Sequence, residues 1–152
     1  MSDTSLTFSN TDRTWEQCRN DDPETIYAFW QEGEFQCVIL RGPNSVNGYI
    51  GVLPNHPLYG LDYMDRRVSG IECHGGLTYA GMGHDGHALC EPFWWFGWDY
   101  AHLWDRVFYE DHPGDMEWTP RYILAEFPGV IKSFRRSSGN YTLIDVEARD
   151  GE

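Results

Sequence analysis

The chain has 152 residues, enough for one domain with a hydrophobic core and too few for two comfortable ones. Its formal net charge of −13 would repel nucleic-acid phosphates, so direct binding to DNA or RNA is not expected. No apolar run approaches the ~20 residues that span a bilayer, the first residues do not resemble a signal peptide, and the four cysteines form no C-x-x-C pair. These features predict a soluble protein of the reducing cytoplasm with no membrane partner.

The N-terminal part of the chain predicts a flexible segment followed by a short helix. Residues 1–13 are polar, and we expect them to be flexible and to precede a single domain over residues 14–148. The pair Asp22-Pro23 has the order of a capping residue and a first-turn proline, and an apolar stretch follows it. This pattern predicts a helix over residues 25–31 that ends near Gly33.

Most of the remaining apolar runs predict strands, because they are short and are bounded by turn-forming residues. A turn at residues 42–45 separates the first two runs, which favours an antiparallel hairpin. Residues 54–60 hold two prolines and a glycine and predict an ordered loop, whereas the glycine- and histidine-rich residues 82–91 predict a flexible excursion. The expected extended segments are residues 34–41, 46–53, 68–73, 77–80, the aromatic segment through Phe96, and residues 141–146.

Helical structure is expected after the aromatic strand and again near the C-terminus. The chain is predicted to turn helical near Asp99. Thr119-Pro120 is a good N-cap and first-turn pair for a helix over residues 121–135, which Pro128-Gly129 should kink or interrupt. The order of the elements favours an α+β fold, in which a single domain has a mostly antiparallel sheet with a C-terminal helix packed on it.

Two segments rich in glycine, histidine and aromatic residues are predicted to face each other as the walls of a site. Residues 93–105 read FWWFGWDYAHLWD, an aromatic density that a small core rarely needs. Residues 73–81 place His74 before Gly75 and Gly76, where an exposed backbone can come close to a ligand. The sequence therefore predicts where a site lies more firmly than what it does.

The polar residues of these segments leave several roles open. Asp99 and His102 are three residues apart and would share one face of a helix, and His74 can approach them from a neighbouring strand. Two imidazoles and a carboxylate can hold a divalent metal, act as base, acid and orienting group, or tie loops together by buried hydrogen bonds. Because neither spacing is a diagnostic metal motif, no metal or other cofactor is predicted. Asp105 is either a partner that fixes the His102 tautomer or a solvated residue.

The tryptophan cluster favours a ligand pocket. Consecutive strand residues point to opposite faces, so a core takes two of Trp94, Trp95 and Trp98, and the third lies on the far face or at a rim. Rim aromatics stack on flat ligands with about 1–3 kcal/mol each, and the amides of Gly75 and Gly76 can bind a phosphate. A nucleotide-like small molecule is the expected ligand. The predicted ligand-binding residues are His74, Gly75, Gly76, Thr78, Trp95, Trp98, Asp99 and His102.

Three sequence blocks resemble a largely uncharacterised group of small proteins found in bacteriophages, prophages and some bacteria. The blocks are GYIGV with HPLYG at residues 48–60, HGGLTYAG at 74–81 and WWFGWDYAH at 94–102. The resemblance covers about residues 46–135 and implies a phage accessory protein of the host-cell cytoplasm, a class in which counter-defence and host takeover are common. Residues 82–89 depart from the pattern, so their histidines, His84 and His87, inherit no role.

Three functions follow as expectations. The first is binding of the nucleotide-like ligand in an aromatic and histidine pocket, for counter-defence or host takeover. The second is a hydrolase in which His74, Asp99 and His102 are catalytic, with or without a divalent metal, although we expect the isolated protein to bind such a metal weakly or not at all. The third is an acidic inhibitor that docks on a host protein and does not need His74. Homo-oligomers are compatible with each of the three.

Overall fold

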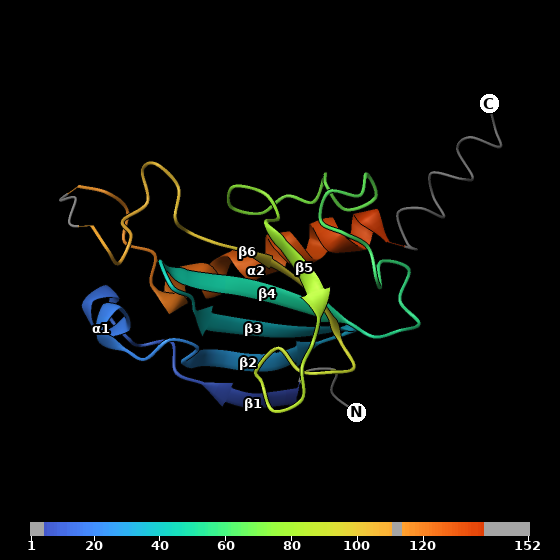
Figure 1. The fold of residues 1–152 in the computed structure, drawn as a ribbon, viewed down its shortest axis with the longest axis horizontal. Coiled ribbons are helices and arrows are strands. Elements are labelled where there is room, and N and C mark those ends of the chain that lie inside the picture. Colours follow the sequence, from blue (N-terminus) through green and yellow to red (C-terminus); the bar gives the residue numbers. More distant parts are fainter. Residues whose placement is uncertain (1–4, 111–113, 139–152) are drawn as a thin grey trace.

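A computed structural model describes residues 5–110 and 114–138, which form a six-stranded antiparallel sheet with a long helix on one face (Figure 1). The α+β class, the antiparallel sheet and the packed C-terminal helix are thus confirmed. The strand order is β1-β2-β3-β4-β6-β5, and every neighbouring pair is antiparallel. The elements are β1 (Ser5–Ser9), α1 (Trp15–Asn20), β2 (Ile26–Glu32), β3 (Phe35–Arg41), β4 (Val46–Val52), β5 (Tyr79–Met82), β6 (Trp94–Trp98) and α2 (Pro120–Ser137).

The helix predicted over residues 25–31 is wrong, because this segment is strand β2. Its β-branched and aromatic residues suit an extended backbone, and its whole length pairs with β3. Gly33, with φ of +57°, and Glu34 form the two-residue loop of the hairpin, so the residue expected to end a helix turns a strand instead. The Asp22-Pro23 signal belongs to a turn in which the Thr25 amide donates to the Asp22 carbonyl.

The helices differ from the sequence prediction in two further respects. Helix α1 was not predicted, although Thr14 and Gln17 form a capping box at its start, with the side chain of each bonded to the backbone of the other. Helix α2 begins after Thr119 as predicted but runs without interruption through Pro128. The flanking residues Phe127 and Val130 are buried against the sheet, and this packing outweighs the loss of one backbone hydrogen bond at the proline.

Other predicted segments also change. Residues Ser5–Ser9, expected within a flexible region, pair with β2 as an edge strand. The extended segment expected at residues 68–73 forms no strand: residues 68–70 are a turn and residues 71–73 are irregular. The segment expected at 77–80 becomes β5, which begins at Tyr79. The predicted hairpin of β3 and β4 is confirmed. The strand predicted at residues 141–146 lies outside the described residues.

Both faces of the sheet are covered, which decides where a site can lie. On one face, α2 and the long connection between β4 and β5 pack over the larger core cluster. On the other face, the connection between β5 and β6 covers a smaller cluster of Val38, Leu40 and Trp95 (Figure 1). All seven residues of β3 are buried for this reason. Among the described helices, none has both the length and the apolar character required to cross a bilayer.

Candidate functional site

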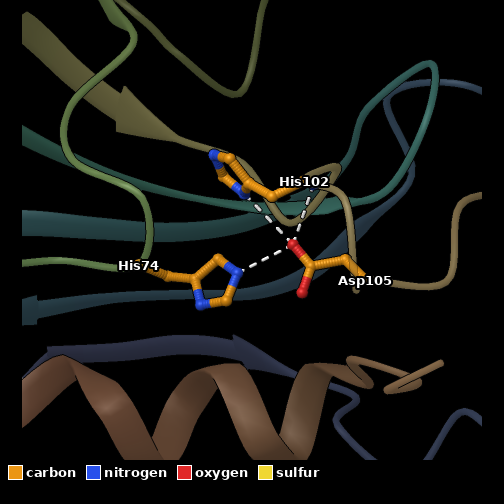
Figure 2. Close-up of side chains that lie close together, drawn as sticks. All are labelled: His74, His102 and Asp105. Carbon is orange, nitrogen blue, oxygen red and sulfur yellow. Dashed lines mark hydrogen bonds and ion pairs between the residues drawn. The ribbon is translucent and has the colours of Figure 1, made fainter.

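His74, His102 and Asp105 meet in one cluster at an end of the sheet, where two connections come together (Figure 2). Oδ2 of Asp105 lies 2.8 Å from Nε2 of His74 and 3.1 Å from Nδ1 of His102. The same oxygen accepts a hydrogen bond of 2.9 Å from the backbone N–H of His102. Oδ1 of Asp105 accepts from Nε1 of Trp118 at 2.9 Å. The carboxylate thus organises both imidazoles.

The chain reaches this arrangement through tight turns rather than through a helix. The helix expected near Asp99 is absent. Oδ1 of Asp99 accepts from the Ala101 amide at 3.2 Å, and the Asp105 amide donates to the His102 carbonyl at 2.9 Å. These local side-chain and backbone bonds replace the helical ladder. Hydrogen bonds of the Arg106 and Met116 amides then close the following loop, which brings Trp118 back to the carboxylate.

Gly75 has a structural reason to be glycine. Its φ is +72°, and a Cβ atom built there would lie 2.2 Å from Nε2 of His102. The backbone therefore comes closest to the imidazole rather than to a ligand. Gly76 shares the left-handed conformation, with φ of +82°, but no atom lies within 4 Å of the corresponding Cβ position. The space beside Gly76 is therefore open.

Aromatic rings fix the orientation of His74. Tyr100 stacks on its imidazole at a centroid distance of 4.4 Å and an interplanar angle of 21°, and Trp118 packs at 4.9 Å. The Tyr100 hydroxyl donates to Glu126 of α2 and accepts from Nε1 of Trp98. Burial and the Glu126 hydrogen bond raise the pKa of Tyr100 far above its ordinary value, so the hydroxyl stays protonated. A chain of contacts thus connects the sheet and α2 to His74.

Asp105 is ionised in spite of being only 3% exposed. Burial by itself raises the pKa of a carboxyl group, but the hydrogen bonds from His74 and from the backbone and ring of His102 outweigh it and hold the pKa of Asp105 below its ordinary value. Because an ionised carboxylate only accepts hydrogen bonds, the ring nitrogens that contact it carry hydrogen when no metal is bound. The contact between Asp105 and His102 that the sequence suggested is confirmed, and His74 shares it.

Asp99 lies on the other side of His102. Its Oδ1 is 3.9 Å from Nε2 of that residue, and its Oδ2 accepts from the Thr78 hydroxyl at 3.2 Å. The structure therefore brings His74, Asp99 and His102 together, with Thr78 holding the outer carboxylate. Among the cavities found in the described residues, none is lined by all three.

Trp95 and Trp98 do not stand at a pocket rim, which corrects the sequence interpretation. They are 0% and 1% exposed and lie on opposite faces of β6. Trp95 donates to the Cys90 carbonyl under the connection between β5 and β6, and Trp98 packs toward α2. The connection between β5 and β6 covers the sheet face that holds Trp95, so this ring is buried on that face as well.

Two cavities flank the cluster. One, of about 510 Å³, is lined by His102 and Asp105 together with Ala101, Leu103, Val107, Tyr109, Glu110 and Asp115. The other, of about 450 Å³, lies between His74 and α2. Among the described residues that line the first cavity, none is Lys or Arg, so its wall is apolar and acidic. Cys73 lines the second cavity, and burial raises the pKa of its thiol to about 12, which makes it a poor nucleophile near neutrality.

Sequence reasoning missed Trp118 and Tyr100 as partners of the site and gave the central role to Asp99 instead of Asp105. The position of Asp105 three residues after His102 was an available signal; the contact of Trp118 depends on how the intervening loop closes.

Ligand atoms of His74, His102 and Asp105 all lie within 4.8 Å of one another, close enough to hold a metal ion. Comparisons with protein-family models, curated proteins and solved structures gave no match to this chain.

Proposed function

We propose that this protein is a hydrolase that activates water at the cluster of His74, His102 and Asp105. The observation that carries the proposal is the position of Asp105, a buried carboxylate that orients two imidazoles beside a cavity. The side chain of His102 is 32% exposed, so one face of the cluster is open to a substrate. The proposal is the hydrolase alternative from the sequence with Asp105, rather than Asp99, at its centre.

Hydrolysis needs a group that takes a proton from water as the water oxygen forms a bond to carbon or phosphorus. The bond to the leaving group then breaks, and the proton passes to that group. An imidazole oriented by a carboxylate can take this proton. An ion held by the same atoms would lower the pKa of its bound water, which would then lose its proton to solvent and attack as hydroxide. With either mechanism, the reaction would take place at the cluster of His74, His102 and Asp105.

The substrate we propose is a nucleotide-like small molecule, as expected from the sequence for a phage accessory protein, a class in which counter-defence and host takeover are common. The cavity of about 510 Å³ beside His102 falls in the size range of small-molecule sites. Tyr109 lines this cavity and is 67% exposed, so it can stack on a base in place of the buried tryptophans.

The test is incubation of purified protein with a bacterial nucleotide extract, followed by mass spectrometry of the retained and the altered species. We expect at least one species to be hydrolysed, and His102→Ala to lower kcat/KM by about 100- to 10,000-fold. His87→Ala, in the connection between β5 and β6, is the matched control and should leave the rate unchanged. A compound that is retained but never altered would replace the hydrolase with the binding protein first expected from the sequence.

The docking inhibitor is the second candidate, and exposed apolar residues beside the cavity favour it. Leu103 and Trp104 are 86% and 69% exposed in the loop that follows His102. If host-protein binding is the activity, Leu103→Ser with Trp104→Ser should abolish co-purification of one specific host protein, whereas His74→Ala should not. Loss of substrate turnover in His102→Ala with no bound host protein would reject this candidate.

A further inference from the structure

The contacts of Asp105 are crowded on one of its two oxygens. Oδ2 lies within 3.1 Å of three nitrogen atoms, namely the backbone and ring nitrogens of His102 and Nε2 of His74, whereas Oδ1 has the single Trp118 donor. A carboxylate oxygen has two lone pairs, so three N–H groups cannot all reach it with good geometry. Figure 2 shows both rings turned toward this same oxygen.

We infer that His74 Nε2, His102 Nδ1 and Asp105 Oδ2 bind a divalent transition-metal ion, with zinc as the first choice. Bonds of about 2.0–2.2 Å to a tetrahedral ion place the ligand atoms about 3.3–3.6 Å apart. Oδ2 lies 2.8 Å from Nε2 of His74 and 3.1 Å from Nδ1 of His102, so small outward shifts of the side chains would make room for the ion. The ion takes the place of the two ring hydrogens, and Oδ2 keeps one lone pair for the His102 amide. The inference rests on the proposed function for its role, since it names what activates water at that site.

The ligand set is that of a catalytic rather than a structural site. Two imidazoles and one carboxylate leave the fourth position of a tetrahedral ion open, which water or substrate can occupy. Structural zinc sites are instead closed, mostly by cysteines. Cys73 is adjacent to His74 in sequence but lines the cavity beside α2.

A second layer of contacts holds the proposed ligands in place. Trp118 donates to the second oxygen of Asp105, which favours a single bond from this carboxylate to the ion. An imidazole that binds an ion through one ring nitrogen would carry its hydrogen on the other. For His102 this nitrogen is Nε2, which lies 3.9 Å from the Asp99 carboxylate. A carboxylate on this side of the ring would orient a metal-bound histidine if the two atoms approached to hydrogen-bond distance.

A divalent ion also changes the charge of the cavity. Glu110 and Asp115 lie in its wall, and no described lining residue is Lys or Arg. A phosphate group would be repelled by this wall, whereas an ion at the cluster gives it a positive centre to bind. The ion therefore reconciles an acidic cavity with a nucleotide-like substrate.

The experiment uses the full chain without an affinity tag, treated with a chelator and then dialysed against Zn²⁺ or Co²⁺. We expect one ion per chain by elemental mass spectrometry, and Co²⁺ absorption of the intensity typical of four- or five-coordinate ions. His74→Ala and His102→Ala should each lose the ion. Asp99→Asn and Trp118→Phe should weaken metal affinity by about 10- to 100-fold, because they remove contacts outside the ligands.

Two controls separate this site from other zinc-binding groups. His84→Ala combined with His87→Ala removes a second histidine pair, whose rings lie 5.9 Å apart, and Cys73→Ser removes the nearest thiol. Both variants should keep the ion. Circular dichroism checks the fold of each variant, and the partly exposed His102 offers His102→Gln if His74→Ala does not fold. Failure of the wild-type protein to retain either ion, or full retention by His102→Gln, would overturn the inference.

Metal binding and hydrolysis are measured separately, so one of the two proposals can fail while the other holds. Hydrolysis by protein that binds no ion would reject the metal site and leave the imidazole of His102 as the base. An ion bound at the cluster without hydrolysis of any species in the extract would keep the metal site and reject the hydrolase.

Discussion

Trp118 connects the candidate site to the start of α2 through one hydrogen bond. Replacing it by Phe removes the donor to Asp105 but keeps an aromatic ring beside His74. We expect Trp118→Phe to lower the free energy of unfolding by about 1.5–3 kcal/mol, the contribution of a hydrogen bond to a charged group. Urea denaturation measures this change. Trp104→Phe is the matched control: Trp104 is 69% exposed, and its replacement should change the free energy by less than about 0.5 kcal/mol.

The adjacent Gly75 and Gly76 allow backbone strain and crowding to be separated. Gly76→Ala should lower the free energy of unfolding by about 1–2 kcal/mol, because alanine must adopt a positive φ there. Gly75→Ala has the same strain, and its Cβ must also push His102 away from Asp105. This displacement should lower the free energy of unfolding by about a further 1.5–3 kcal/mol. Urea denaturation of both variants, with NMR of the His102 ring, tests this difference. Equal losses in the two variants would show that the ring moves without cost.

At the scale of elements, α2 contains a position where glycine weakens a helix. Gly129 lies in its interior, is exposed, and has no atom within 4 Å of a built Cβ. Gly129→Ala should therefore raise the free energy of unfolding by about 0.5–1 kcal/mol. Ala125→Gly, at another exposed position of the same helix, should lower it by a similar amount. Thermal unfolding followed at the helical signal measures both, and a fall in stability for Gly129→Ala would show that the chain is not regularly helical near Pro128.

The elements also show what could be read from the sequence. The strands β3 and β4 were predictable because their apolar runs are bounded by turn residues, and α2 because Thr119-Pro120 marks its start. Strand β2 was not, since its apolar residues fit a helical face as well as a strand, and only pairing with β3 decides between them. Local signals set the ends of elements, whereas partners distant in sequence set their type.

The candidate site was predictable to a similar degree. The contact of the His74 and His102 segments followed from their shared composition, and the structure places the two rings at a centroid distance of 5.1 Å. Trp118 and Asp105 are thirteen positions apart in the sequence, and no periodic signal connects them. The burial of Trp95 depends on a loop that covers the sheet, and periodicity does not reveal such a cover.

For the whole molecule, paired carboxylates predict loss of stability in acid. The pKa values of Asp21, Glu34 and Asp105 are held below their ordinary values, and the pKa of Asp65 is lowered to about 2. In the unfolded chain these carboxylates have their ordinary, higher pKa values, so the unfolded chain takes up protons at a higher pH than the folded chain does. The ionised carboxylates therefore stabilise the fold fully above those unfolded pKa values. This stabilisation is lost as the pH falls from about 5 to about 2. Urea denaturation across this range measures the loss.

Asp21 tests the origin of that loss. Burial alone would raise the pKa of this carboxyl group, but hydrogen bonds from Arg13 and Tyr27 lower it. Asp21→Asn should therefore reduce the dependence of the unfolding free energy on pH below about 5. The exposed Asp85→Asn is the control and should leave the dependence as it is in the wild-type chain. An equal reduction in both variants would indicate that relief of the net negative charge, rather than specific pairing, governs the acid response.

Asp105 receives its hydrogen bonds from three stretches of chain: the turn at His74, the turn at His102 and the residues just before α2. None of these stretches belongs to the sheet, and the carboxylate is where they meet. They should therefore open to solvent together, as one cooperative unit less stable than the strands. Native-state hydrogen exchange would then give the amides of Gly76, Asp105 and Arg106 a common opening free energy, well below that of β3.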